Sequence, residues 1–153
     1  MKAAVGIIAN PASGKDIRRL VAQASTVPDH AKASVVAQAL LGLGAVGVEQ
    51  VLMMPDEQQL GLKALWRLGP GEQRRLPQVE MLAMSVTGKA ADSTQAAAEM
   101  RARGVGGILV LGGDGTARAV SRGAGEVPLL CVSTGTNNVL PVFIEGTIAG
   151  MAV

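Results

Sequence analysis

Three short polar stretches, each directly after an apolar run, combine glycine with hydroxyl, amide and carboxylate side chains. They are Asn10-Pro-Ala-Ser-Gly-Lys15, Gly112-Gly-Asp-Gly-Thr116 and Ser133-Thr-Gly-Thr-Asn-Asn138. Glycine after a strand lets the backbone turn sharply and bring N–H groups close to anionic oxygens. A carboxylate among such groups can accept a proton or hold a metal ion. The three stretches together therefore predict a site for a phosphorylated ligand.

The second stretch has the clearest context, because it follows the apolar run Ile108–Leu111. Such a run is typical of a parallel strand that is buried on both faces. Asp114 would then lie at the carboxyl end of a strand, where open α/β sheets bind their ligands. An ordinary strand–turn–helix connection explains glycine and aspartate equally well at this one place. The two companion stretches favour the ligand-binding interpretation.

The bulk composition indicates one folded domain. The chain has 153 residues, of which 48% are hydrophobic and 17% charged, and this argues against disorder. Trp66 and Phe143 are its only aromatic residues, so the core must consist of Ala, Val, Leu, Ile and Met. The net charge of +2 comes without a basic stripe or interleaved aromatic residues, and we therefore expect no nucleic-acid binding.

The single cysteine and the apolar runs indicate the cellular compartment. Cys131 excludes an internal disulfide, and within the apolar run 128–132 it is interpreted as buried strand filler. No run of about 18 apolar residues is present, so no membrane span is expected. The apolar start of the chain meets Asn10-Pro11 without a small-residue cleavage site, which favours a first strand over a signal peptide. We expect a cytoplasmic protein.

Apolar runs alternate with amphipathic segments along the chain. Strands are predicted over 2–9, 46–53, 81–84 (or from Val79), 105–111 and 127–132. Helices are predicted over 16–24, 29–44, 55–68, 92–103 (capped by Asp92 or Ser93) and 116–122, with another starting at Glu145. This alternation predicts an α/β fold, a three-layer domain with a parallel sheet of about five strands flanked by helices. The irregular stretch 67–78 is predicted to be a mobile surface loop.

Two common nucleotide-binding signatures are absent. A Walker A loop requires glycine where Ala9 stands and a hydroxyl residue where Asp16 follows Gly14-Lys15. A dinucleotide-binding Gly-x-Gly-x-x-Gly motif does not follow the first strand, which disfavours a hydride-transferring dehydrogenase.

The three polar stretches resemble, in order and residue type, motifs of the NAD kinase and diacylglycerol kinase-like superfamily of ATP-dependent phosphotransferases. The first resembles its Asn-Pro-x-Ser-Gly loop, the second its Gly-Gly-Asp-Gly-Thr signature, and 135–138 its Gly-Thr-x-Asn element. The longer runs 8–19 and 133–138 are most similar to the branch of ATP-NAD kinases that contains a protein of acetoin catabolism. The lipid-kinase pattern continues with an acid where Val139 stands, which disfavours a lipid kinase.

This resemblance implies an enzyme that uses ATP and Mg²⁺ to phosphorylate the adenosine 2′-hydroxyl of NAD, with a link to acetoin catabolism. Asp114 would be the catalytic base or the carboxylate next to Mg²⁺, and Thr116 would cap the following helix. The implied nucleotide- and phosphate-binding residues are Asn10, Ser13, Gly14, Gly112, Gly113, Gly115, Thr116, Thr134, Gly135, Thr136, Asn137 and Asn138.

The same resemblance sets the domain organisation. Residues 1–153 would be the nucleotide-binding N-terminal domain, and the β-rich C-terminal domain of the family is expected to be absent from this chain. A non-catalytic nucleotide-binding module or a truncated kinase domain therefore stays open as an alternative. The apolar segment from Glu145 to Val153 predicts a terminal helix and, if that helix is exposed, a homo-oligomer.

Overall fold

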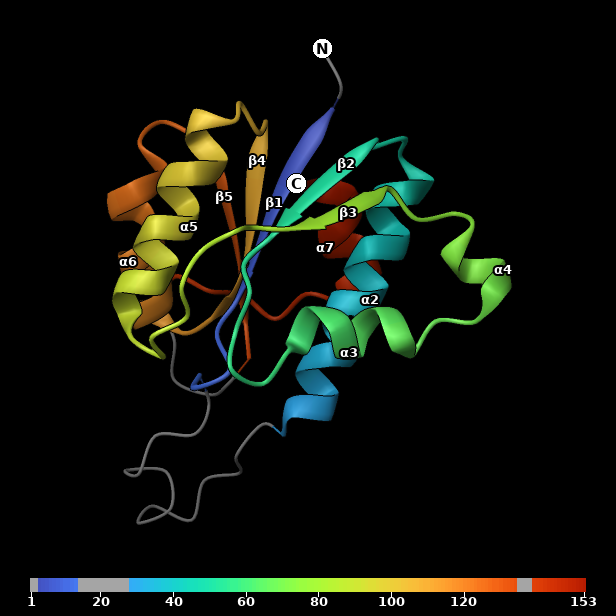
Figure 1. Ribbon diagram of the computed structural model, residues 1–153, viewed down its shortest axis with the longest axis horizontal. Helices are drawn as coiled ribbons and strands as arrows, with labels where there is room; N and C mark the ends of the chain where they lie inside the picture. The colour runs from blue at the N-terminus through green and yellow to red at the C-terminus, as the bar shows by residue number, and fades with distance from the viewer. Residues whose placement is uncertain (1–2, 14–27, 135–138) are drawn as a thin grey trace.

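The computed structural model describes residues 3–13, 28–134 and 139–153. Within them, the strands form one parallel sheet in the order β3-β2-β1-β4-β5 (Figure 1). The strand bounds are β1 Ala4–Ala9, β2 Gln50–Met53, β3 Gln78–Met81, β4 Gly107–Gly112 and β5 Leu129–Ser133. The predicted parallel α/β sheet is confirmed.

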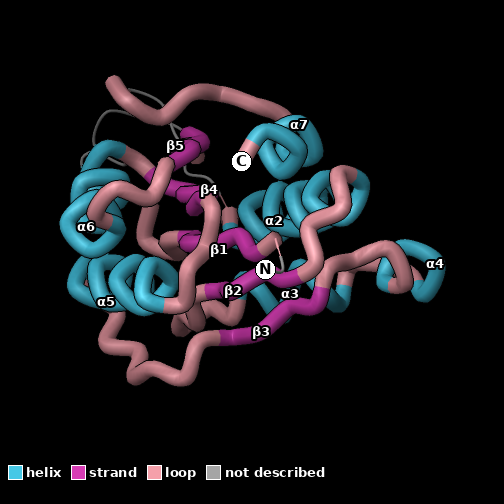
Figure 2. Tube along the Cα trace, turned by 90° about the horizontal axis from the view of Figure 1, so that it is seen from above, coloured by secondary structure: helices cyan, strands magenta, loops and turns pink. Residues whose placement is uncertain are grey.

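Helices cover both faces of this sheet and give the three layers that the sequence predicts (Figure 2). One face is covered by α2, α3 and α7, and the other by α5 and α6. The helix bounds are α2 Asp29–Ala45, α3 Leu60–Trp66, α4 Pro70–Gln73, α5 Ala90–Ala102, α6 Asp114–Ala124 and α7 Gly146–Ala152.

Two apolar clusters form the core, one on each face of the sheet. Successive residues of a strand point to opposite faces, so Ile7 joins the cluster under α2 whereas Ile8 joins the cluster under α5 and α6. The inner strands β1 and β4 are therefore apolar along their whole length, whereas the edge strand β3 carries Gln78 and Glu80. Trp66 is 72% exposed and Phe143 76%, so the core is free of aromatic side chains, as predicted.

The strand order reverses between β1 and β4, so the carboxyl edge between these two strands is the switch point at which open α/β sheets form a ligand-binding crevice. The next described helix after β1 is α2, on one face of the sheet, and the helix that follows β4 is α6, on the other face. Loops that diverge in this way leave room between them, and open α/β sheets bind ligands at this position. Asn10 follows β1 and Gly113 follows β4, so two of the three predicted stretches flank the crevice.

Several predicted boundaries are wrong for local reasons. The third strand lies at 78–81, so the predicted extension back to Val79 is right but the predicted end at Met84 is wrong, because the register pairs Met81 with Met53, where β2 ends. The second strand starts at Gln50 instead of Val46, because Val46 and Gly47 still donate to α2 carbonyls and Gly47 has a φ of 83°. The third helix starts at Leu60 because Gln59 takes a left-handed conformation (φ 54°).

The helix caps also differ from the prediction. Thr116 does not cap α6, which begins at Asp114 after the N-cap Gly113. Asp92 does not occupy the N-cap of α5 but lies in its first turn, and its carboxylate accepts hydrogen bonds from Thr87 and Gly88. The stretch 67–78 contains the short helix α4, and the helix predicted over 16–24 lies outside the described residues.

Glu145 is the N-cap of α7 and accepts hydrogen bonds from the N–H groups of Thr147 and Ile148. Among the described residues, no helix has the length and apolar character needed to cross a bilayer.

Candidate nucleotide-binding site

Asn10 joins the loop after β1 to the start of α6. Its Nδ2 donates a hydrogen bond of 2.8 Å to Oγ1 of Thr116, and its Oδ1 accepts one from the N–H of Ala12. Its own N–H extends the pairing of β1 with β4 by donating to the Leu111 carbonyl. Asn10 is therefore held by backbone and side chain at once, directly over the crevice.

Ser13 joins the same loop to the end of β5. Its Oγ lies 2.6 Å from Oγ1 of Thr134, and both residues are buried. The Ser13 hydroxyl is also within hydrogen-bond distance of the Asn10 carbonyl, at 3.0 Å. The structure thus brings together residues from all three predicted stretches. Five predicted residues lie outside the described part of the chain, namely Gly14, Gly135, Thr136, Asn137 and Asn138.

Asp114 is the first residue of α6, and the N-cap residue of this helix is Gly113, which has no side chain to cap it. The N-terminus of α6 therefore points its partial positive charge toward the crevice, which favours an anion there. The Asp114 carboxylate accepts hydrogen bonds of 3.0–3.1 Å from the N–H groups of Leu140 and Val139. These bonds, that of Leu140 first, lower the pKa of Asp114 below its usual value.

The glycines of the second stretch differ in their surroundings. A Cβ on Gly112 would lie 2.6 Å from Cβ and Oγ1 of Thr116, so glycine is needed there for β4 to pass against α6. A Cβ on Gly115 would meet nothing within 4 Å, and Gly115 is exposed. Gly112 therefore has an internal packing role, whereas Gly115 leaves the backbone of α6 open to approach.

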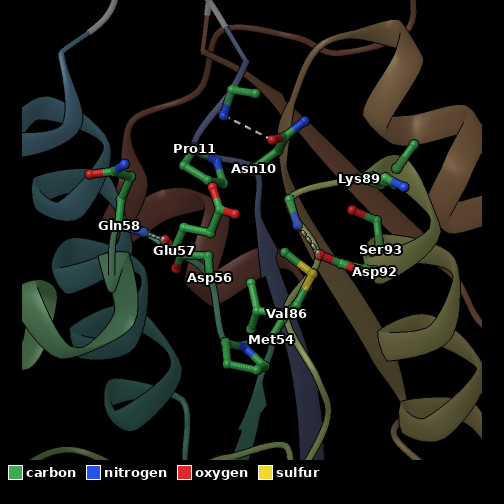
Figure 3. A pocket seen from close by; sticks show the side chains of 14 residues that line it. Asn10, Pro11, Met54, Asp56, Glu57, Gln58, Val86, Lys89, Asp92 and Ser93 are labelled. Carbon is green, nitrogen blue, oxygen red and sulfur yellow. Dashed lines mark hydrogen bonds between the residues drawn. The ribbon is translucent and has the colours of Figure 1, made fainter.

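A cavity of about 280 Å³ opens beside Asn10 (Figure 3). Its walls come from the loop after β1, the loop between β2 and α3, and the loop that leads into α5. The lining includes Pro11, Asp56, Glu57, Gln58, Lys89 and Ser93. The sequence did not predict the walls formed by the loops after β2 and β3. Both loops begin where a parallel strand ends, so they lie at the same edge of the sheet as the loop after β1.

Two carboxylates of this cavity hold the backbone of its walls. Asp56 accepts hydrogen bonds from the N–H groups of Gln58 and Leu60, but burial outweighs them and raises its pKa. Burial also acts to raise the pKa of Asp92, where hydrogen bonds from Thr87 and Gly88 prevail and lower it. Glu57 lies against Gly88, where a Cβ would be 2.7 Å from its Oε1. Carboxylate side chains therefore line the cavity and fix the backbone of two of its loops.

A sequence comparison decides the family. The profile of the ATP-NAD kinase N-terminal domain matches residues 5–152, which is nearly the whole chain. The chain belongs to the ATP-NAD kinase family. The chain is also similar to Acetoin catabolism protein X from Cupriavidus necator, with 46% sequence identity over 150 residues. The match covers 97% of this chain and 42% of that relative, so the chain spans less than half of the relative's length.

Carboxylates that could take part in holding a metal ion are dispersed in the described part of this ATP-NAD kinase family domain. Across residues 3–13, 28–134 and 139–153, no group of three or more His, Cys, Asp or Glu side chains can hold a metal. Mg²⁺ commonly binds through one or two carboxylates together with substrate phosphates and water. Asp114 could supply the carboxylate in that arrangement.

Other reactive side chains of the domain lie in ordinary settings. Cys131 in β5 is half-buried, and its burial, followed by the charge of Asp114, raises the thiol pKa. A protonated thiol is a poor nucleophile, so the interpretation as strand filler fits. His30 is exposed near the start of α2, and Met53 lies in the core.

Proposed function

We propose that this chain is the nucleotide-binding domain of an ATP-dependent phosphotransferase of the NAD kinase type. Its substrates would be ATP and NAD, and the acceptor would be the 2′-hydroxyl of the NAD adenosine. The observation that carries the proposal is the convergence of Asn10, Ser13, Thr116 and Thr134 at the crevice, beside Asp114 and the uncapped end of α6. Family membership supports the reaction class.

The proposed chemistry needs few protein groups. As the acceptor oxygen forms its bond to the γ-phosphorus, the bond from that phosphorus to the bridging oxygen of ADP breaks, and Asp114 takes the hydroxyl proton. The N-terminus of α6 and the N–H groups near Gly115 would hold phosphate oxygens, because phosphoryl transfer depends mainly on positioning and charge stabilisation. Bound Mg²⁺ would neutralise phosphate charge. The cavity beside Asn10 would receive part of a nucleoside.

The test is turnover by the longest polypeptide that the gene encodes, with ATP, Mg²⁺ and NAD, followed as formation of NADP. Asp114→Asn should lower kcat by about 100-fold or more, within the range that general-base catalysis contributes. Glu126→Gln is the matched control, since Glu126 is an exposed carboxylate at the opposite edge of the sheet, before β5. Wild-type turnover in Asp114→Asn would remove Asp114 from the mechanism.

A second candidate function is a nucleotide-binding module without turnover. The observation that favours it is that the Asp114 carboxylate accepts hydrogen bonds from the N–H groups of Val139 and Leu140, which lower its pKa and so make it a weaker base. Nucleotide binding by calorimetry without any NADP formation would select this function over the kinase.

The physiological setting that we propose is acetoin catabolism, on the strength of the relative's name and its 46% identity. A deletion strain should then grow more slowly on acetoin than on glucose. Equal growth on both would contradict this setting.

Self-association is a separate proposal, which also requires a test. α7 packs Ala149 and Gly150 inward and leaves Ile148 and Met151 exposed, and Phe143, which precedes α7 in the chain, is exposed as well. Light scattering after size exclusion should give the mass of an oligomer, and a monomer at high concentration would contradict it.

A further inference from the structure

Lys32 is a lysine with only 1% of its surface exposed, in the second turn of α2. A buried ammonium group is costly unless hydrogen-bond acceptors surround it. A lysine held in this way usually has partners that only its long stem and three donors can reach. The partners of Lys32 therefore indicate its purpose.

Two acceptors of the Lys32 ammonium group lie in the loop after β1. Nζ of Lys32 donates to the Pro11 carbonyl at 2.5 Å and, over a longer 3.4 Å, to the Asn10 carbonyl. The Asn10 carbonyl also accepts from the N–H of Ser13. The ammonium group thus lies behind the loop whose side chains reach Thr116 and Thr134.

We propose that Lys32 is a positioning residue for nucleotide binding. It holds the carbonyls of Asn10 and Pro11 so that the Asn10 and Ser13 side chains stay at the crevice, and it places a positive charge behind the phosphate-binding region. The inference rests on the proposed function, because it assumes that a nucleotide occupies the crevice. A neutral side chain of the same length would leave the Pro11 carbonyl without this donor and would remove the charge.

Two properties distinguish this role from simple core packing. Packing would require the volume of the side chain, which methionine reproduces closely, whereas positioning requires the donors and the charge. The effect would also be local, since the loop at 10–13 would loosen while the sheet and α2 remain folded. The affinity for a nucleotide and the exchange of the loop amides should therefore change together.

The experiment uses the full 153-residue chain and the variant Lys32→Met. Calorimetric titration with ATP and Mg²⁺ gives the dissociation constant, and hydrogen–deuterium exchange reports on the N–H groups of Ala12 and Ser13. Lys63→Met is the control for the same chemical change on a partly exposed lysine, and Leu40→Ala is the control for lost stability within α2. All measurements are made below the unfolding transition of every variant.

Lys32→Met should weaken ATP binding by about tenfold or more, and the exchange of Ala12 and Ser13 should be faster. Lys63→Met and Leu40→Ala should stay within about twofold of the wild-type affinity. Should Lys32→Met fail to fold, Lys32→Gln replaces it, with a shorter neutral side chain that retains an amide donor.

Three results would overturn the inference. Unchanged affinity in a folded Lys32 variant would do so while leaving the proposed function intact. Weaker binding without faster exchange of the loop amides would exclude positioning through the loop. If the wild-type chain binds no nucleotide, the proposed function itself fails, and the role of Lys32 fails with it.

Discussion

Asn10 and Thr116 are 106 positions apart in the sequence and are joined by a hydrogen bond of 2.8 Å from Nδ2 to Oγ1. Asn10 follows β1, and Thr116 lies in the first turn of α6, just after β4. The bond therefore spans the crevice between the two central strands. A ligand in the crevice would contact a surface that both loops build together.

Replacing Thr116 by valine should reveal the energetic value of that bond. Valine keeps the shape of the side chain against Gly112 but removes the oxygen, so the half-buried amide of Asn10 loses its acceptor. We expect a loss of about 1–2 kcal/mol in the free energy of unfolding, measured in urea. Thr116→Ser keeps the oxygen and should lose less. Equal stability of the valine variant and the wild type would show that the bond contributes nothing.

The contact of Ser13 with Thr134 can be measured by a double-mutant cycle. Both residues are buried and their hydroxyl oxygens lie 2.6 Å apart, so Ser13→Ala and Thr134→Val should be non-additive. The expected coupling is about 1 kcal/mol in the free energy of unfolding. Additive effects of the two changes would mean that the loops after β1 and β5 are energetically independent.

Asp92 should make stability depend on pH at the acidic end. Burial acts to raise its pKa, but the hydrogen bonds from Thr87 and Gly88 prevail, so its pKa is lower in the folded chain than in the unfolded chain. A lowered carboxyl pKa contributes stability above the unfolded-state value, near 4, and this contribution disappears as the pH falls through the folded-state value.

Asp92→Asn tests this contribution. The variant should unfold more easily than the wild type at pH 7, by about 1–3 kcal/mol, because its amide replaces an acceptor of three hydrogen bonds. The difference between the two proteins should shrink as the pH falls below about 4. Thermal melts at several pH values provide the measurement, and a difference that does not change with pH would contradict the assignment.

Gly150 should be essential for the packing of α7 on α2. A Cβ at this position would lie 2.1 Å from the Ala39 carbonyl oxygen, which belongs to the backbone of α2 and cannot move aside alone. Gly150→Ala should therefore cost about 1–3 kcal/mol in the free energy of unfolding.

Gly71→Ala is the matched control for this substitution. A Cβ on Gly71, in α4, would meet nothing within 4 Å. The free energy of unfolding of Gly71→Ala should therefore be unchanged or raised by up to about 1 kcal/mol. Denaturant midpoints of the two variants give the comparison. Equal effects of the two changes would mean that the close approach of α7 to α2 is not needed for stability.

The class of fold follows from local pattern alone. Continuous apolar runs such as Ile108–Leu111 identify strands buried on both faces, and glycines near segment ends identify helix termini. The predicted ends of a strand are less accurate than its existence where pairing with a neighbouring strand decides those ends. The apolar run at 81–84 looks like a strand by itself, yet β3 ends at Met81 because β2 ends at Met53.

The sequence by itself determined the α/β class, the helices that flank the sheet and the three polar stretches, because each depends on residues close together in the chain. Only the tertiary structure decided which of those residues meet. Asn10 reaches Thr116, Lys32 lies behind the loop, and the loops after β2 and β3 form the cavity beside Asn10. Strand order sets these contacts, and strand order depends on which faces the helices bury, which no local segment can specify.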